Sequence, residues 1–299
     1  MQNFFSLSRK ICNFIIRRTH KYVDNRIARG VVAKILQIDR RRIDSLNIRN
    51  RCINIFTDQY LYKCQLYGDS VKRDLMNRKM FSVYLQPGMV SPIKVYKRKP
   101  LTIIMPILKP VDNHEEAACY ILDKLKRISH ETAFRIEDYP LIMDGLRLLG
   151  KCKSGVTLRK KLFKYLKRQQ GSIVRVGIVH GDFHRDNIMY KGNLPVLIDF
   201  DCSRKDDIQA VDALYYILEE VRRSNEYNNP LLEDWLLIYR NIDMMYEYRC
   251  AEQIDIDFRF GLIIFFLERI SQEQRYNCRF IDEQENSIKK ISHMIKLEK

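Results

Sequence analysis

The sequence predicts an α+β fold with two lobes: a small, mixed N-terminal lobe built on an antiparallel sheet and a larger, mainly helical C-terminal lobe. Short apolar runs separated by turn residues fill the stretch from about residue 43 to residue 110, and helical periodicity prevails after Pro110. The 299 residues, 46% of them hydrophobic, can bury a sizeable core. We therefore expect a basic extension at 1–44, an N-terminal lobe at 45–110 and a C-terminal lobe at 111–299 that contains the catalytic loop.

The expected extension has a basic amphipathic pattern. Apolar residues recur near helical spacing from Leu7 to Tyr22 with basic residues between them, and a second helix is expected at 27–36. Residues 1–50 hold twelve Lys or Arg against three Asp, so more than half of the formal net charge of +16 lies there. The apolar stripe could pack on the rest of the protein, or residues 1–36 could attach to an anionic membrane; we disfavour nucleic acid as a partner.

Four strands and one helix are expected in the N-terminal lobe. The strands are predicted at 52–56, 60–67, 93–96 and 101–107, and the helix at 71–85 lies between the second and the third. Turn residues such as Thr57-Asp58 and Pro87-Gly88 separate these elements. This order is typical of a small lobe in which one helix covers a sheet.

Helices dominate the predicted C-terminal lobe. They are expected at 115–129, 157–169, 208–223, 230–248, 257–272 and 283–296. No membrane span is predicted, because the longest apolar run, Leu262–Leu267, is far shorter than the roughly 20 residues that a bilayer requires. The eight scattered cysteines form no Cys-x-x-Cys pair, which argues against zinc and indicates a reducing compartment. We expect a cytoplasmic protein.

The segment 173–200 breaks the helical pattern and carries the candidate catalytic residues. Three apolar runs, 173–179, 187–190 and 195–200, alternate there with polar turns. His180, Asp182 and Asn187 have the spacing of the H-x-D-x-x-x-x-N loop used in phosphoryl transfer, and Asp199 follows after an expected hairpin. The alternative is an ordinary turn in which these side chains only cap local structure.

Each of these residue types suits phosphoryl transfer, which depends on positioning and charge neutralisation. We expect Asp182 to accept or orient the proton of the attacking hydroxyl and His180 to support the loop geometry. Asn187 and Asp199 offer the oxygen ligands that Mg²⁺ prefers when it bridges the phosphates of ATP.

The run HGDFHRDN followed by VLIDFD resembles the aminoglycoside phosphotransferase and choline kinase superfamily, a branch of the protein-kinase-like fold, over about residues 45–270. Gly181 before the catalytic Asp, and Ile198-Asp199-Phe200-Asp201 in place of Asp-Phe-Gly, match that superfamily. The resemblance implies a kinase that uses ATP and Mg²⁺. It also implies structural roles for Asp212 and for His130, which closes the run DKLKRISH.

In the N-terminal lobe the resemblance implies that Lys63, in the strand-like QYLYKCQLY, binds the nucleotide phosphates. Its helical partner is normally Glu, but the predicted helix offers only Asp74. The segment 102–108 resembles the strand before the interlobe hinge, where backbone groups of Met105 and Ile107 would receive adenine. A solvent-facing lysine and an ordinary buried strand are the alternatives.

The acceptor is constrained by what the motif lacks. Gly181 stands where a protein kinase has the Arg that reads an activation loop, and no Ala-Pro-Glu follows Asp199, so a small-molecule or glycan acceptor is favoured. The basic charge disfavours cationic acceptors and suits an anionic one, such as a lipopolysaccharide core sugar, whose kinases share the resemblance. A protein-modifying effector and a catalytically idle binding module are the alternatives. Contact with the inner membrane face would follow if residues 1–36 bind lipid.

Overall fold

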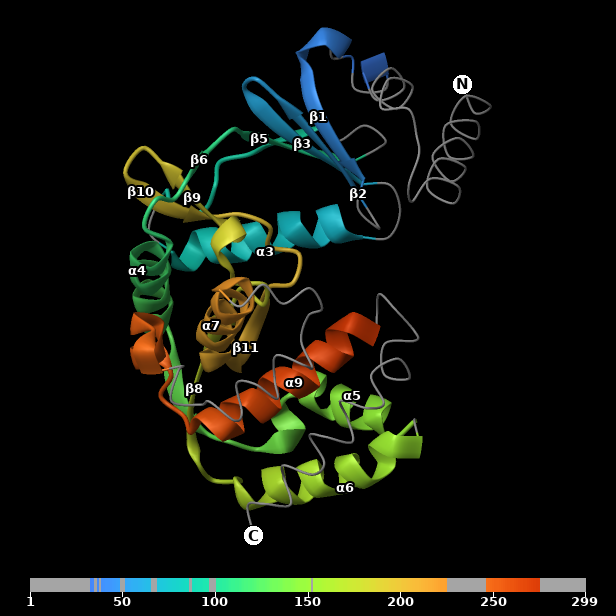
Figure 1. Cartoon of the computed structure of the whole chain (residues 1–299), viewed down its shortest axis with the longest axis vertical. Helices are drawn as coiled ribbons and strands as arrows, with labels where there is room; N and C mark the ends of the chain where they lie inside the picture. The colour runs from blue at the N-terminus through green and yellow to red at the C-terminus, as the bar shows by residue number, and fades with distance from the viewer. Residues whose placement is uncertain are drawn as a thin grey trace. The chain divides into compact units, whose positions relative to one another are not determined.

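The computed structural model describes residues 33–34, 37, 39–48, 52–65, 69–85, 88–96, 101–151, 153–224 and 246–274 (Figure 1). The expected basic helix at 7–22, most of the second one at 27–36, and the expected helices at 230–248 and 283–296 lie wholly or mostly outside these residues. The chain divides into two compact units, one formed by 1–79 with 91–109 and the other by 80–90 with 110–299.

The first unit is built on a five-stranded antiparallel sheet with the strand order β1-β2-β3-β5-β4 (Figure 1). Its strands are β1 (Ile43–Ile48), β2 (Cys52–Thr57), β3 (Tyr60–Gln65), β4 (Lys94–Tyr96) and β5 (Thr102–Pro106). Thr57 closes the tight turn between β2 and β3, because its Oγ1 accepts a hydrogen bond from the backbone N–H of Tyr60 at 3.0 Å. All strands except β1 were expected, with ends that differ by one or two residues.

The two faces of β3 pack against different clusters, because successive side chains of a strand point to opposite faces. Cys64 packs with Ile55 on one face. Leu61 packs on the other face with Val71, which belongs to helix α3 (Ser70–Tyr84). Lys63 shares the face of Leu61 and is therefore directed toward α3.

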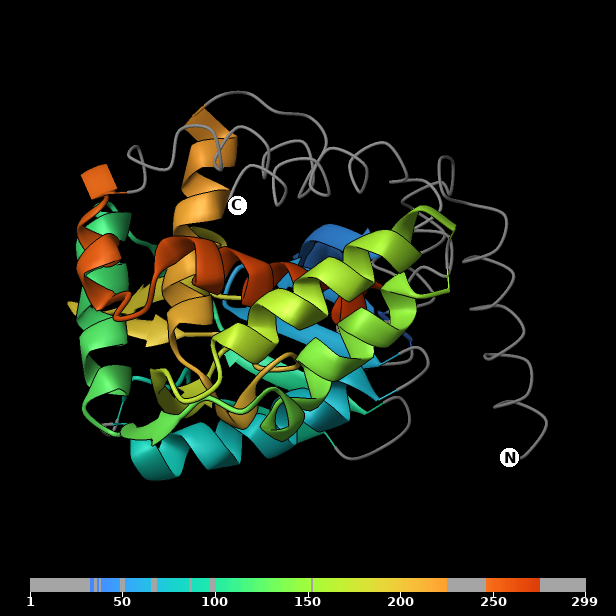
Figure 2. The same cartoon turned by 90° about the horizontal axis from the view of Figure 1, so that it is seen from below.

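Helices form most of the second unit. They are α4 (His114–Lys126), α5 (Pro140–Leu149), α6 (Lys153–Arg168), α7 (Ala210–Ser224) and α9 (Phe258–Gln274), with the 3-10 turns η2 (Ile136–Asp138), η3 (Arg185–Asn187) and η5 (Arg249–Gln253). Figures 1 and 2 show α5 lying along α9. A Cβ at Gly145 would lie 2.1 Å from the carbonyl oxygen of Leu267, so only glycine permits this close approach of the two helices.

The prediction was wrong at several places in this unit. The helix expected to reach Ser129 ends at Lys126, because the backbone N–H groups of Ile128 and Ser129 bond to carbonyls three residues back in a tighter turn. His130 then opens a strand instead of closing a helix. Helix α5, which begins with Pro140 at its first position, was not expected at all.

Two small sheets position the loops of the second unit. One has the order β11-β8-β7 and the other β10-β9-β6, from β6 (Lys109–Pro110), β7 (His130–Ala133), β8 (Ile173–Val179), β9 (Ile188–Lys191), β10 (Leu194–Leu197) and β11 (Arg204–Ile208). Strands β9 and β10 form the expected antiparallel hairpin. Asn187 therefore directly precedes β9, and Asp199 follows the end of β10.

A large apolar core underlies these loops. Phe134, Phe183, Tyr216 and Leu267 are among its nearly or fully buried side chains, and they come from loops and helices distant in the sequence. Burial of such side chains contributes roughly 1.5–3 kcal/mol each to folding, which gives the loops a rigid support. No helix in the described part of the chain combines the length and the apolarity needed to cross a membrane.

Candidate active site

The loop that follows β8 is held by the carboxylate of Asp212 at the start of α7. The backbone N–H of His180 donates to Asp212 Oδ2 at 2.7 Å, and that of Gly181 donates to Oδ1 at 2.8 Å. Asp212 is only 1% exposed, and burial raises its pKa against the opposing effect of these contacts. The carboxylate satisfies two buried backbone donors, which fits the structural role that the resemblance implied.

Gly181 adopts a conformation and a packing that exclude other residues. Its φ is +78°, and a Cβ would lie 2.4 Å from the carbonyl oxygen of Cys202. The close approach brings the loop after β8 against the loop after β10. Local sterics therefore require glycine at position 181. This requirement is separate from the argument that a protein kinase would have an Arg there.

His180 connects the same two loops and is fully buried. Its Nε2 lies 2.9 Å from the carbonyl oxygen of Ile198, so Nε2 carries the hydrogen that is donated. Its own carbonyl accepts a hydrogen bond from Ser203 Oγ at 3.0 Å. His180 therefore acts as a positioning residue that fixes the segment containing Asp199 relative to the loop containing Asp182.

Asp182 lies among groups that stabilise its ionised form. Asn187 Nδ2 donates to the Asp182 carbonyl at 2.8 Å and to Oδ2 at 3.3 Å. His184 Nε2 lies 3.6 Å from Oδ2, and Arg269 Nη1 lies 3.8 Å from Oδ1. Burial alone would raise the pKa of Asp182, but His184 and Arg269 outweigh it and hold that pKa below its usual value. The carboxylate is therefore ionised and can accept a hydrogen bond from a substrate hydroxyl.

Arg269 is the site residue that sequence reasoning missed. It lies on α9 and donates from Nη2 to the hydroxyl of Tyr215 on α7 at 3.1 Å, with its guanidinium 4.8 Å from the centre of that ring. The two contacts hold the cation beside Asp182. No local motif surrounds Arg269 in the sequence, so only the packing of α7 against α9 could identify it.

Asn187 and Asp199 fit the site of a single Mg²⁺. The Nδ2 group of Asn187 is used in hydrogen bonds to Asp182, which leaves the amide oxygen as its ligand atom. The backbone N–H of Ile198 donates to the Asn187 carbonyl at 3.1 Å, and this places Asp199 one residue from that contact. Mg²⁺ is commonly held by one or two protein oxygens together with substrate phosphates and water. Within the described ranges no three His, Cys, Asp or Glu side chains converge as a metal site. A Mg²⁺ ion held by one or two protein oxygens does not need a cluster of that kind.

Asp199 has an uncommon backbone conformation. Its φ of +59° lies in the left-handed region, which Asp tolerates better than most non-glycine residues. Such strain is frequent at functional sites, where the surrounding structure holds the residue in place. Here the neighbouring Phe200 is fully buried, and its ring packs 5.2 Å from that of His180.

Within the first unit, the structure brings Lys63 and Asp74 together. Lys63 Nζ lies 3.1 Å from Asp74 Oδ2, and Arg78 Nε lies 2.7 Å from Oδ1. All three side chains are buried. Burial raises the pKa of Asp74, but the two cations outweigh it and lower that pKa. Asp74 thus pairs with Lys63 as the sequence suggested, and Arg78 is a second partner that the sequence did not indicate.

The expected adenine contacts lie on β5 and just after it. Met105 is buried, and its Sδ lies 3.1 Å from Arg78 Nη2. The backbone N–H of Ile107 donates to the Gln59 carbonyl at 2.9 Å, so that N–H is engaged within the sheet. A hinge role for Ile107 therefore depends on its carbonyl, and the adenine site stays a prediction.

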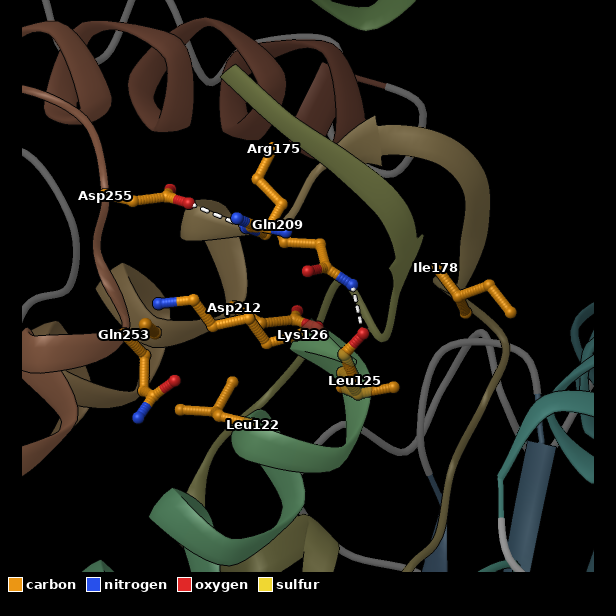
Figure 3. Close-up of a pocket in the computed structure, with 10 residues that line it drawn as sticks. Leu122, Leu125, Lys126, Arg175, Ile178, Gln209, Asp212, Gln253 and Asp255 are labelled. Atoms are coloured by element: carbon orange, nitrogen blue, oxygen red, sulfur yellow. Dashed lines mark hydrogen bonds and ion pairs between the residues drawn. The ribbon is translucent and has the colours of Figure 1, made fainter. Parts of the chain in front are cut away.

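A small cavity lies beneath the catalytic loop, beside Asp212 (Figure 3). Gln209 Nε2 crosses it to the Leu125 carbonyl at 2.8 Å, and Arg175 Nε reaches Asp255 Oδ2 at 2.9 Å. Its volume of about 10 Å³ admits about one water molecule. This cavity belongs to the support of the loop and is too small for a substrate.

Comparison with known proteins identifies the fold. Residues 108–239 match the family model described as the phosphotransferase enzyme family. The predicted superfamily is confirmed. The match also confirms the predicted enzyme class, a phosphotransferase. It contains His180, Asp182, Asn187 and Asp199, the residues expected to carry phosphoryl transfer.

Solved structures show which fold this chain shares. The choline kinase LicA from Streptococcus pneumoniae superposes with a TM-score of 0.51 at 13% identity, covering 90% of this chain and 98% of the kinase. The amicoumacin kinase hAmiN, in complex with AMP-PNP, Ca²⁺ and Ami, gives a TM-score of 0.51 at 12% identity, covering 92% and 95%. These likenesses confirm the protein-kinase-like fold. No curated protein matched the sequence.

Proposed function

We propose that this phosphotransferase uses ATP and Mg²⁺ to transfer the γ-phosphate to a hydroxyl of a small-molecule or glycan acceptor. The observation that carries the proposal is the arrangement of Asp182, an ionised carboxylate bonded to Asn187, on a loop that His180 links to the segment of Asp199. The alternative was an ordinary turn whose side chains only cap local structure. Such a turn would not need the buried His180 and the buried Asp212 to fix its backbone.

In the proposed mechanism Asp182 accepts a hydrogen bond from the acceptor hydroxyl and orients its oxygen toward the γ-phosphate. Because the pKa of Asp182 is lowered, orientation of the hydroxyl is its main contribution, and the proton leaves late in the transfer. Asn187 and Asp199 would hold Mg²⁺, which neutralises phosphate charge when bound. Lys63 would bind the nucleotide phosphates, oriented by Asp74.

We further propose that the acceptor is anionic, for example a phosphorylated surface glycan or a lipopolysaccharide core sugar. The formal charge of +16 supports this, since long-range attraction raises the local concentration of an anionic substrate. Helix α6 adds support within the described residues, because it contains seven basic residues and no acidic one. Its exposed cations are Arg159, Lys160, Lys164, Lys167 and Arg168.

Contact of residues 1–36 with the anionic inner face of a membrane completes the proposal, supported by the charge of that segment. The full chain should sediment with vesicles containing anionic lipid at low salt and should be released at high salt. Arg17→Glu with Arg18→Glu should abolish binding. A control that reverses two charges on α6, Lys160→Glu with Lys164→Glu, should retain it. Equal loss in both variants would refute a specific role for residues 1–36.

The catalytic assignment is tested by the same substitution at two positions. Asp182→Asn should lower transfer by about 10²- to 10⁴-fold with ATP binding retained, since it removes only the hydroxyl-orienting charge. Asp206→Asn, at an exposed position of the same unit, should leave transfer unchanged. Asp199→Ala should weaken both binding and transfer. Undiminished turnover in Asp182→Asn would exclude the proposed site.

A thermal-shift assay separates an enzyme from an idle scaffold. ATP with Mg²⁺ at 100 times Kd should stabilise the folded state by about 2.7 kcal/mol. A protein that shows no shift, and that labels no product when incubated with labelled ATP and fractionated lysate, would be a binding module. A labelled product would identify the acceptor directly.

A further inference from the structure

Two cysteines outside the catalytic site lie in unusually close contact. Cys119 on α4 and Cys250 on η5 are separated by 131 positions in the sequence, yet their Sγ atoms lie 3.1 Å apart. A disulfide bond is about 2.05 Å long, so the sulfurs need to approach by only about 1 Å. Both cysteines are free thiols in this structure.

The surrounding contacts hold the two thiols in place. The backbone N–H of Arg249 donates to Glu115 Oε1 at 2.7 Å, and this bond fastens η5 to α4 on the neighbouring turn. Cys250 Sγ also lies 3.9 Å from the Glu115 carbonyl oxygen. Because both cysteines sit on segments already bonded to each other, little backbone rearrangement is needed for their sulfurs to meet.

Access to the pair is one-sided. Cys250 is fully buried, whereas Cys119 is partly exposed and lines a surface hollow of about 320 Å³. The rim of the hollow includes Glu116, Asp123 and Glu252 with one cation, Arg249. A reagent therefore meets Cys119 first, and the acidic rim favours a cationic reagent over an anionic one.

The two thiols also differ as acids. The pKa of Cys119 is lowered, chiefly because Cys250 can donate a hydrogen bond to its sulfur, while the same interaction and burial raise the pKa of Cys250. The carboxylates of Glu115 and Glu252 oppose the thiolate and Arg249 favours it. The attacking thiolate therefore forms at the accessible sulfur.

We propose that Cys119 and Cys250 form a site of reversible covalent modification, at which a small-molecule disulfide converts the two thiols into an intramolecular disulfide. In the first step the Cys119 thiolate attacks one sulfur of the reagent, forming a mixed disulfide and releasing one thiolate. In the second step Cys250 loses its proton and attacks Cys119 Sγ, which releases the second thiol of the reagent. Two protein thiols are oxidised and one reagent disulfide is reduced to two thiols.

The reaction is tested on the full chain with cystamine, a cationic disulfide. After blocking of the remaining thiols, denaturation and digestion, mass spectrometry should find peptides linked through Cys119 and Cys250, and dithiothreitol should separate them. A stable cysteamine adduct on Cys119 without the link would overturn the proposal. So would a link between other cysteines, or no reaction.

Single variants assign the order of the steps. Cys250→Ser should stop at the Cys119 adduct, and Cys119→Ser should leave Cys250 unreacted over the same time. Cys52→Ser, at a buried cysteine of the other unit, should form the link as the unaltered protein does. Rapid modification of Cys250 in the Cys119→Ser variant would contradict the one-sided access.

The link should also change stability, because it closes a loop of 131 positions that contains the catalytic segment. The Tm should rise by about 5 °C or more on oxidation and return on reduction. Cys250→Ser treated in the same way should show no rise. A fall in Tm when the bond forms would mean that the thiols are not preorganised, against the proposal. None of these measurements depends on phosphotransfer.

Discussion

Lys63 Nζ lies 3.1 Å from Asp74 Oδ2, and the two side chains are 5% and 0% exposed. Arg78 contacts the other oxygen of the same carboxylate, so two buried cations share one buried carboxylate. Burial of an unbalanced charge is costly unless a partner compensates it. Asp74 supplies such compensation and fixes the ammonium group of Lys63, which agrees with the phosphate-binding role proposed for Lys63.

Removing the carboxylate should destabilise the protein strongly. Asp74→Ala leaves two buried cations without their common partner, and we expect the free energy of unfolding to fall by about 3–5 kcal/mol. Asp69→Ala is the matched control, since Asp69 is 57% exposed and pairs with Arg73 at the surface; it should cost at most about 1 kcal/mol. Urea denaturation measures both, and equal losses would contradict the importance of the buried pair.

The same carboxylate should make stability depend on pH. The pKa of Asp74 is lower in the folded state than its ordinary value of about 3.9, so the folded protein binds fewer protons than the unfolded one. Its contribution is therefore complete above pH 4 to 5 and is lost as pH falls, with a slope of up to about 1.4 kcal/mol per pH unit. Urea denaturation between pH 3 and 7 should show a shallower slope for Asp74→Asn. An unchanged slope would mean that Asp74 does not titrate as described.

Gly181→Ala should disrupt the catalytic loop. The substitution combines a positive φ with a Cβ placed 2.4 Å from the Cys202 carbonyl oxygen, so the loops around Asp182 and Asp199 must separate. Gly192→Ala is the matched control, because its φ is +64° and a Cβ there meets no atom within 4 Å. The control should cost about 1–2 kcal/mol of stability with activity retained. Gly181→Ala should cost more and lose activity, and similar behaviour of the two variants would exclude the steric explanation.

Arg269→Gln should lower kcat and leave ATP binding unchanged. Without the guanidinium between Tyr215 and Asp182, the carboxylate loses a group that fixes its orientation, and we expect kcat to fall about 10-fold or more. Arg259→Gln, on an exposed face of the same helix, provides the control. Steady-state kinetics with ATP and acceptor varied separately would distinguish the outcomes. A change confined to KM for ATP would assign Arg269 to nucleotide binding instead.

Several elements with continuous apolar patterns were predicted from the sequence, whereas strands that form only by pairing with another strand were not. Helix α7 and strand β8 have continuous apolar patterns, and both were expected within two residues of their ends. Strand β1, with the sequence IDSLNI, is half polar and lacks a regular alternation, and strand β11, with the sequence RKDDI, is mostly polar; both become strands because they pair with β2 and β8. Their propensity was overridden by tertiary pairing.

The sequence by itself determined the catalytic segment, because the separation of His180, Asp182 and Asn187 along one loop is a local property that a spacing motif can express. Only the tertiary structure decided what surrounds it. Arg269 reaches Asp182 through the packing of α9 against α7, and Cys119 meets Cys250 across 131 positions. Such contacts depend on which apolar faces pack against each other. A single sequence shows which face of a helix or strand is apolar, but it does not show which other element covers that face.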